Sequence, residues 1–187
     1  MARGSPRFTG RATRRHPRRA TRRCRIPTTR HTAIITPSHR TAALPAVTDQ
    51  RRAAVVAEAQ TWLKTPYHHM GRVKGAGADC LTLLAEVYER AGVLPHIELP
   101  YYPPDWHLHR GEERYADGLL AYAREIDPPP QPADIALWRY GRCFAHAAIV
   151  VLWPTIVHAQ ADARLVCWGD ATQGSLACRA VRFFDPF

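Results

Sequence analysis

Three residues in this chain have the types and spacing needed for nucleophilic catalysis, and the first of them is Cys80. It follows Asp79 at the end of a glycine-rich stretch and precedes the amphipathic run Leu81–Tyr88. Asp79 is a good N-cap, because its carboxylate can accept from the backbone N–H groups of a first helical turn. Cys80 would then begin the helix, where the positive end of the helix dipole favours thiolate over thiol. This placement is typical of a cysteine nucleophile, and a buried cysteine acting as a small hydrophobic residue is the alternative.

The other two residues are histidines on a predicted β-hairpin. Phe144–Leu152 and Thr155–Ala159 are rich in β-branched and apolar residues, and Trp153-Pro154 separates them. His146 lies near the start of the first strand and His158 near the end of the second. These two ends are neighbours in an antiparallel hairpin, so the imidazoles can meet. Each histidine alone could be a half-buried strand residue, but together with Cys80 they match a nucleophile, a base and an orienting group.

Two helices are expected ahead of the strands to position these groups. The first runs from Asp49 to Leu63 and is ended by Thr65-Pro66. A loop from Tyr67 to Ala78 contains three glycines within seven residues, so its backbone can turn tightly beneath the nucleophile. The second helix begins at Cys80 and ends at Gly92, a typical residue for the position after a helix.

The rest of the chain completes an α+β pattern. Leu94–Asp105 is rich in proline and tyrosine and is expected to form one wall of a groove, and Arg110–Glu125 is expected to be a third, amphipathic helix. Further strands are expected at 132–138, 165–168 and 180–184. Helices that precede strands favour helices packed on one face of an antiparallel sheet.

These motifs, in this order, resemble the NlpC-type cell-wall endopeptidases, which are papain-like cysteine peptidases. The resemblance covers Thr48 to Phe187 and is closest to the branch of phage and prophage tail cell-wall peptidases. It is carried by five short segments: Thr65-Pro66-Tyr67, Asp79-Cys80-x-x-Leu83, Ala133-Asp134-Ile135, Ala145-His146-Ala-Ala-Ile149 and Ile156-Val157-His158. Leu81-Thr82 replaces the Ser-Gly of many members, and Ala133 replaces a usual glycine.

The resemblance implies a role for each candidate residue. Cys80 would be the nucleophile, His146 the general base and His158 the residue that orients the base. Tyr67 matches a tyrosine beside the nucleophile and, with Asp79, would help to position the substrate or its oxyanion. No cofactor or metal is implied by this chemistry.

The implied reaction is hydrolysis of an amide in a peptidoglycan stem peptide, between D-glutamate and the diamino acid. The implied partners are peptidoglycan and, in the tail branch, phage tail proteins. Two alternatives stay open. One is an acyltransferase or amidase on the same core, which a long apolar groove would favour. The other is a tail-tip structural protein that does not cut.

Charge divides the sequence into two parts. Residues 1–48 contain 12 of the 26 Lys and Arg residues and none of the 16 Asp and Glu residues. Residues 49–187 therefore hold the other 14 basic residues and all 16 acidic residues, and this part is near neutral. We expect residues 1–47 to be a disordered, Arg-rich extension, or a segment upstream of the true start, and 48–187 to be the peptidase domain. A nucleic-acid arm is the less favoured interpretation, because the arginines are not interleaved with aromatic residues.

Apolar runs and the spacing of the cysteines bear on where the protein acts and on whether it binds a metal. The basic start is not followed by an apolar run, so no signal peptide is expected, and no stretch is long enough to span a membrane. We therefore expect synthesis in the cytoplasm and action at the cell wall, within a phage tail or after lysis. The five cysteines show no Cys-x-x-Cys spacing, which gives little support to a zinc site, and a Cys167–Cys178 bridge stays open.

Overall fold

The computed structural model describes residues 47–104 and 112–187, so most of the predicted Arg-rich extension lies outside the described residues. Helix α1 spans Val47–Thr61, α2 spans Cys80–Arg90 and α4 spans Arg114–Leu120. A small hairpin of β1 (Arg72–Val73) and β2 (Gly77–Ala78) lies between α1 and α2. The remaining strands are β3 (Arg124–Ile126), β4 (Ile135–Tyr140), β5 (Cys143–Leu152), β6 (Thr155–Gln160), β7 (Leu165–Asp170) and β8 (Val181–Asp185).

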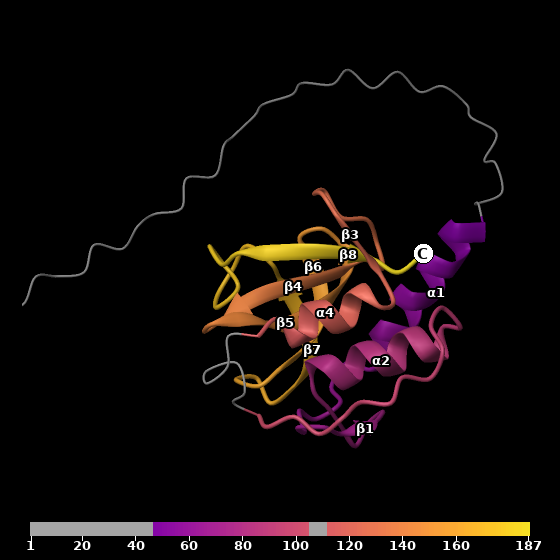
Figure 1. The fold of residues 1–187 in the computed structure, drawn as a ribbon. Coiled ribbons are helices and arrows are strands. Elements are labelled where there is room, and N and C mark those ends of the chain that lie inside the picture. Colours follow the sequence, from indigo (N-terminus) through magenta and orange to yellow (C-terminus); the bar gives the residue numbers. More distant parts are fainter. Residues whose placement is uncertain (1–46, 105–111) are drawn as a thin grey trace, which may run out of the picture. The chain divides into compact units, whose positions relative to one another are not determined.

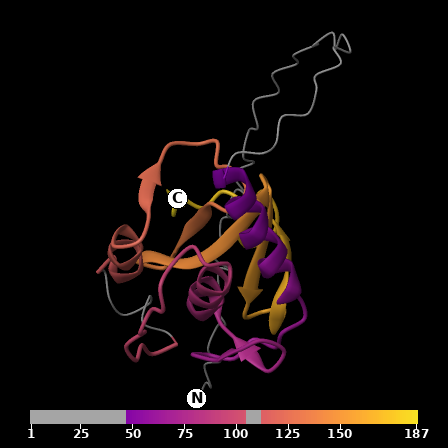
Figure 2. The same ribbon diagram turned by 90° about the vertical axis from the view of Figure 1, so that its right-hand side faces the viewer.

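The six longer strands form one antiparallel sheet in the order β3-β8-β4-β5-β6-β7. Helices α1, α2 and α4 lie on one side of this sheet (Figures 1 and 2). Residues at alternate strand positions face the helices, and they form the main core with α1 and α2; Val55, Leu83, Ile149 and Val157 are examples. The opposite face is covered by a second cluster around Trp138, Ile156 and Phe183. The fold is therefore α+β, as the order of elements in the sequence predicts.

A buried ion-pair cluster fixes α1 on the sheet. The Arg52 guanidinium donates to Asp134 at 2.6 Å and to Asp185 at 2.7 Å, and the side chains of all three residues are at most 10% exposed. Asp134 directly precedes β4 and Asp185 ends β8, so one arginine joins a helix to two neighbouring strands. Ala133, just before this aspartate, has a φ of 66°, a left-handed conformation that explains why glycine suits the position.

Two of the sequence predictions about local structure are wrong. Of the predicted helix at Arg110–Glu125, residues 110 and 111 lie outside the described part, α4 covers Arg114–Leu120, and Arg124–Ile126 is strand β3 paired with β8. Pairing at the sheet edge thus overrides the helical pattern of the segment. The predicted loop Tyr67–Ala78 contains the β1–β2 hairpin, which pairs across only two residues on each side.

Candidate active site

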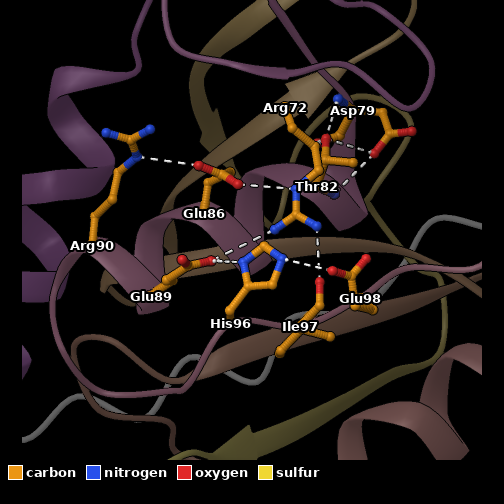
Figure 3. Close-up of polar contacts among 9 residues, drawn as sticks. All are labelled: Arg72, Asp79, Thr82, Glu86, Glu89, Arg90, His96, Ile97 and Glu98. Carbon is orange, nitrogen blue, oxygen red and sulfur yellow. Dashed lines mark hydrogen bonds and ion pairs between the residues drawn. The ribbon is translucent and has the colours of Figure 1, made fainter.

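The start of α2 is built around the carboxylate of Asp79. One oxygen accepts from the backbone N–H groups of Leu81 and Thr82, at 3.1 and 3.0 Å. The Thr82 hydroxyl accepts in return from the Asp79 N–H at 2.9 Å, which completes a capping box (Figure 3). Thr82, a departure from the resembled pattern, therefore has a clear local role. Asp79 is the predicted N-cap, and Cys80 is the first residue of α2.

The second oxygen of Asp79 joins two neighbouring segments to the start of α2. It accepts from the Met70 N–H at 2.8 Å and from the Tyr102 hydroxyl at 2.7 Å, and the His69 ring lies 3.3 Å away. The Asp79 side chain is only 3% exposed. The sequence predicted that Leu94–Asp105 forms a wall of the groove, but nothing in it distinguished Tyr102 as the contact.

The thiol of Cys80 lies beside strand β5. It donates to the carbonyl oxygen of Ala145 at 3.8 Å, and the Tyr115 hydroxyl donates to the Cys80 carbonyl at 3.3 Å. Ala145 directly precedes His146 in β5, so the Cys80 sulfur contacts the residue next to this histidine. Among the described residues, however, no hydrogen bond joins the Cys80 sulfur to His146.

Electrostatics around Cys80 differ from the sequence prediction. Burial, and after it the negative charge of Asp79, raise the pKa of the Cys80 thiol to about 12, against lowering contacts from the backbone N–H groups of Ala147 and Cys80. The helix start was expected to favour thiolate. The carboxylate that caps the helix also places a negative charge beside the sulfur, and this opposes the helix dipole. The arrangement therefore holds a neutral thiol.

The two histidines meet as the predicted hairpin requires. His146 Nε2 and His158 Nδ1 are 2.9 Å apart, and the ring of Tyr140 lies 5.4 Å from that of His146. Burial lowers the pKa of His146 to about 3, with smaller contributions from His158 and Arg179. Burial likewise lowers the pKa of His158 to about 4. Both rings are neutral near pH 7.

The hydrogen bond between the rings decides which nitrogen of His146 is available. Because Nε2 is engaged with His158, Nδ1 is the ring atom that can exchange a proton with a neighbouring group. When His146 Nε2 is the donor to His158, the Nδ1 of the neutral His146 ring is unprotonated and can accept a proton. His158, 3% exposed, is held by close packing: a Cβ at Gly169 would lie 2.8 Å from its Nε2 atom.

Tyr67 also lies in this environment. Burial is the largest cause that raises the pKa of its hydroxyl to about 12, and the neighbouring Cys80 and Asp79 add to the shift. Among the described residues the hydroxyl has no hydrogen-bond partner, so it is available to a substrate oxygen. The five predicted site residues thus occupy neighbouring elements: the loop before β1, the start of α2, and strands β5 and β6.

Three further observations concern the described residues. Residues 47–104 and 112–187 contain no cluster of three or more His, Cys, Asp or Glu residues that could hold a metal ion. In the same ranges, none of the helices combines the length and the apolar character needed to cross a bilayer. The Cys167 sulfur lies 3.6 Å from a Gln160 side-chain oxygen, and no disulfide joins it to Cys178.

Comparison with known proteins identifies the architecture. No family model and no curated protein matches the sequence. The structure resembles the NlpC/p60 domain of the peptidoglycan hydrolase SagA, with a TM-score of 0.51 and 20% identity, over 70% of this chain and 96% of that one. It also resembles NlpC2 from Trichomonas vaginalis, with a TM-score of 0.55 and 16% identity, over 76% and 49% of the two chains.

A third similar structure, from an NLP/P60 family protein of Staphylococcus aureus, has a TM-score of 0.52 and 21% identity over 72% of this chain and 41% of that one. This chain therefore spans nearly all of the SagA domain but less than half of the other two proteins. The identities are low, and what the structures have in common is the arrangement of helices and strands. The described part of the chain has the papain-like α+β fold of NlpC/p60 domains.

Proposed function

We propose that this protein is a cysteine peptidase that hydrolyses an amide bond in peptidoglycan stem peptides, between D-glutamate and the diamino acid. The observation that carries the proposal is the 2.9 Å contact between His146 and His158 beside a cysteine that begins a helix. A base, a group that orients it and a nucleophile are the parts that covalent amide hydrolysis requires. The fold it has in common with a peptidoglycan hydrolase domain supports the choice of substrate.

Because the Cys80 thiol and the His146 ring are both neutral, the first step includes transfer of the thiol proton to His146. On substrate binding the Cys80 sulfur turns from the Ala145 carbonyl toward Nδ1 of His146, which takes the thiol proton as sulfur attacks the amide carbon. His158 accepts from Nε2 of the resulting imidazolium and holds the ring in place. His146 then protonates the leaving amine, and water hydrolyses the thioester.

Charge on the substrate oxygen is stabilised by groups near the sulfur. The backbone N–H of Cys80 stands at the start of α2, beside its own sulfur. It can donate to the oxyanion as the tetrahedral intermediate forms. The Tyr67 hydroxyl is a second candidate donor.

The test is incubation of the purified full-length chain with peptidoglycan, followed by mass spectrometry of the released fragments. Cys80→Ser should abolish release, and His146→Ala should reduce the rate about 10²- to 10⁴-fold, the range for general acid–base catalysis. His158→Asn should cost less than His158→Ala, because an orienting group needs only one hydrogen bond. Full activity of Cys80→Ser would refute the proposal.

We also propose that the protein acts at the cell wall within a phage or prophage tail or after lysis, with the tail proteins as partners. The similarity of its motifs to the tail cell-wall peptidases supports this placement. Mass spectrometry of phage particles purified from an induced lysate tests it. Recovery of the chain only in the particle-free fraction would exclude the tail and leave release at lysis.

A further inference from the structure

A pocket of about 570 Å³ opens beside Cys80. This volume is typical of small-molecule sites, which span about 300–1,000 Å³. One wall is a face of α2 that includes Cys80, Leu84 and Tyr88, and the other walls come from α4 and from the segment Leu94–Pro103. Figures 1 and 2 both show α2 and α4 next to each other. Since a helix rises about 1.5 Å per residue, the pocket follows α2 for about 12 Å from the nucleophile.

The described lining of this pocket is apolar and offers few hydrogen bonds. Three of its tyrosines have their hydroxyls engaged by the protein: Tyr88 donates to the Ala133 carbonyl at 2.9 Å, Tyr102 to Asp79 and Tyr115 to the Cys80 carbonyl. Most of the other lining residues are leucine, isoleucine, proline and alanine. The charged lining residues, Glu98 and Arg114, have side chains 92% and 61% exposed and so lie toward solvent.

The wall opposite α2 is anchored by a network around Arg72. This arginine donates to Glu86 of α2 at 2.9 Å and to the carbonyl of Ile97 in the pocket wall at 2.8 Å. Figure 3 shows it reaching toward Glu89 as well, which is also bound by His96. Together with the bond from Tyr102 to Asp79, these contacts hold Leu94–Pro103 against the nucleophile helix. The pocket is therefore a formed site in the described structure.

We propose that this pocket binds an unbranched aliphatic acyl chain whose carbonyl carbon is attacked by Cys80. The inference rests on the nucleophilic role of Cys80 in the proposed function and adds a second substrate class, acyl esters and acyl amides. A stem peptide carries amides and carboxylates, and their burial without partners is costly. A hydrocarbon chain makes no such demand and gains free energy from leaving water.

The reaction balances with the groups present. The Cys80 sulfur forms a bond to the acyl carbon, and the bond from that carbon to the leaving oxygen or nitrogen breaks. The thiol proton passes through His146 to the leaving group. Water then adds to the thioester carbon and gives a proton back through His146, so that the carboxylic acid leaves and the thiol is restored.

Gly118 provides a direct test, because it lines the pocket from α4. A Cβ at this position would meet no atom within 4 Å, and its φ is outside the left-handed region. Gly118→Leu should therefore fill the pocket without disturbing the backbone. Leu120→Phe is the matched control, since Leu120 lies on the same helix, is 50% exposed and does not line the pocket.

The assay compares p-nitrophenyl acetate with p-nitrophenyl octanoate, with Cys80→Ser as the background. In the unchanged full-length protein kcat/KM should rise with chain length, by at most about fourfold per methylene, the factor for about 0.8 kcal/mol per buried CH₂. Gly118→Leu should lower kcat/KM for octanoate at least tenfold and leave acetate unchanged, and Leu120→Phe should change neither. Mass spectrometry after rapid acid quenching should find the octanoyl group on Cys80.

Each result distinguishes this inference from the proposed function. Equal kcat/KM for the two esters, or an equal loss for both in Gly118→Leu, would overturn the acyl pocket. If Gly118→Leu does not fold, as judged by its melting temperature, Gly118→Ala gives the same comparison with a smaller expected loss. Wall cleavage without an octanoate preference would reject only the acyl pocket. Octanoate preference without wall cleavage would reject only the stem-peptide substrate.

Discussion

Replacement of His158 by glutamine should change how the stability of the protein depends on pH. His158 is 3% exposed, and burial lowers its pKa from 6.5 to about 4. In the unfolded chain its pKa returns to about 6.5. Between these two values the unfolded chain binds a proton that the folded protein does not. The free energy of unfolding must therefore fall as the pH drops from about 6.5 toward 4.

The size of this loss follows from the two pKa values. At pH 4.5 the unfolded His158 is almost fully protonated and the folded one is mostly neutral, which corresponds to a loss of about 2.5 kcal/mol relative to pH 7.5. His158→Gln keeps a donor and an acceptor but does not titrate, so it should lack this loss. His146 contributes in both proteins, because burial is the largest cause of its own pKa shift.

The measurement is urea unfolding at pH 7.5 and 4.5, followed by tryptophan fluorescence, for the unchanged protein and the variant. Trp62 and Trp138 are at most 1% exposed and will report loss of the core. His68→Gln, at a solvent-exposed histidine, is the control and should behave like the unchanged protein. If His158→Gln loses as much stability at pH 4.5 as the unchanged protein, His158 is solvated and the burial argument fails.

Three further predictions concern the packing of His158, the ionisation of Cys80 and the N-terminal segment. Gly169→Ala should destabilise the protein by about 1–3 kcal/mol, the cost of overpacking, and slow wall cleavage at least tenfold, because the new Cβ would lie 2.8 Å from His158 Nε2. Unchanged cleavage would show that the position of His158 is unimportant. Alkylation of Cys80 by iodoacetamide should accelerate from pH 7 to pH 10 without a plateau, since its pKa is raised to about 12. A plateau near neutral pH, absent in Cys80→Ser, would show a thiolate–imidazolium pair instead. A chain that starts at Val47 should keep the melting temperature and the cleavage rate of the full-length protein. If truncation removes a salt-sensitive binding of nucleic acid, residues 1–46 are a nucleic-acid-binding arm. If truncation removes wall cleavage, residues 1–46 bind the cell wall.

Local patterns in the sequence were sufficient for the parts of the fold that depend on neighbouring residues. Asp79 caps a helix because its carboxylate is close to the N–H groups that follow it in the chain. Trp153-Pro154 joins two strands that pair with each other, and this hairpin brings His146 to His158. Short-range geometry decides both features, so a single sequence reveals them.

Long-range pairing accounts for the errors. Arg124–Ile126 continues a helical pattern in the sequence but becomes a strand because β8, far along the chain, offers an edge. The Cys80 thiol was expected to be acidified by its helix. Burial within the folded protein is the largest cause of its raised pKa, the carboxylate of Asp79 adds to it, and together they exceed the effect of the helix start.

The sequence by itself selected Cys80, His146 and His158 as candidate site residues, indicated helices ahead of strands, and showed the resemblance to a peptidase family. The tertiary structure alone decided the protonation state of the site, the tether from Tyr102 to Asp79 and the apolar pocket along α2. These features arise where segments separated in sequence meet and exclude water. Burial depends on that meeting, and no local pattern of residues encodes it.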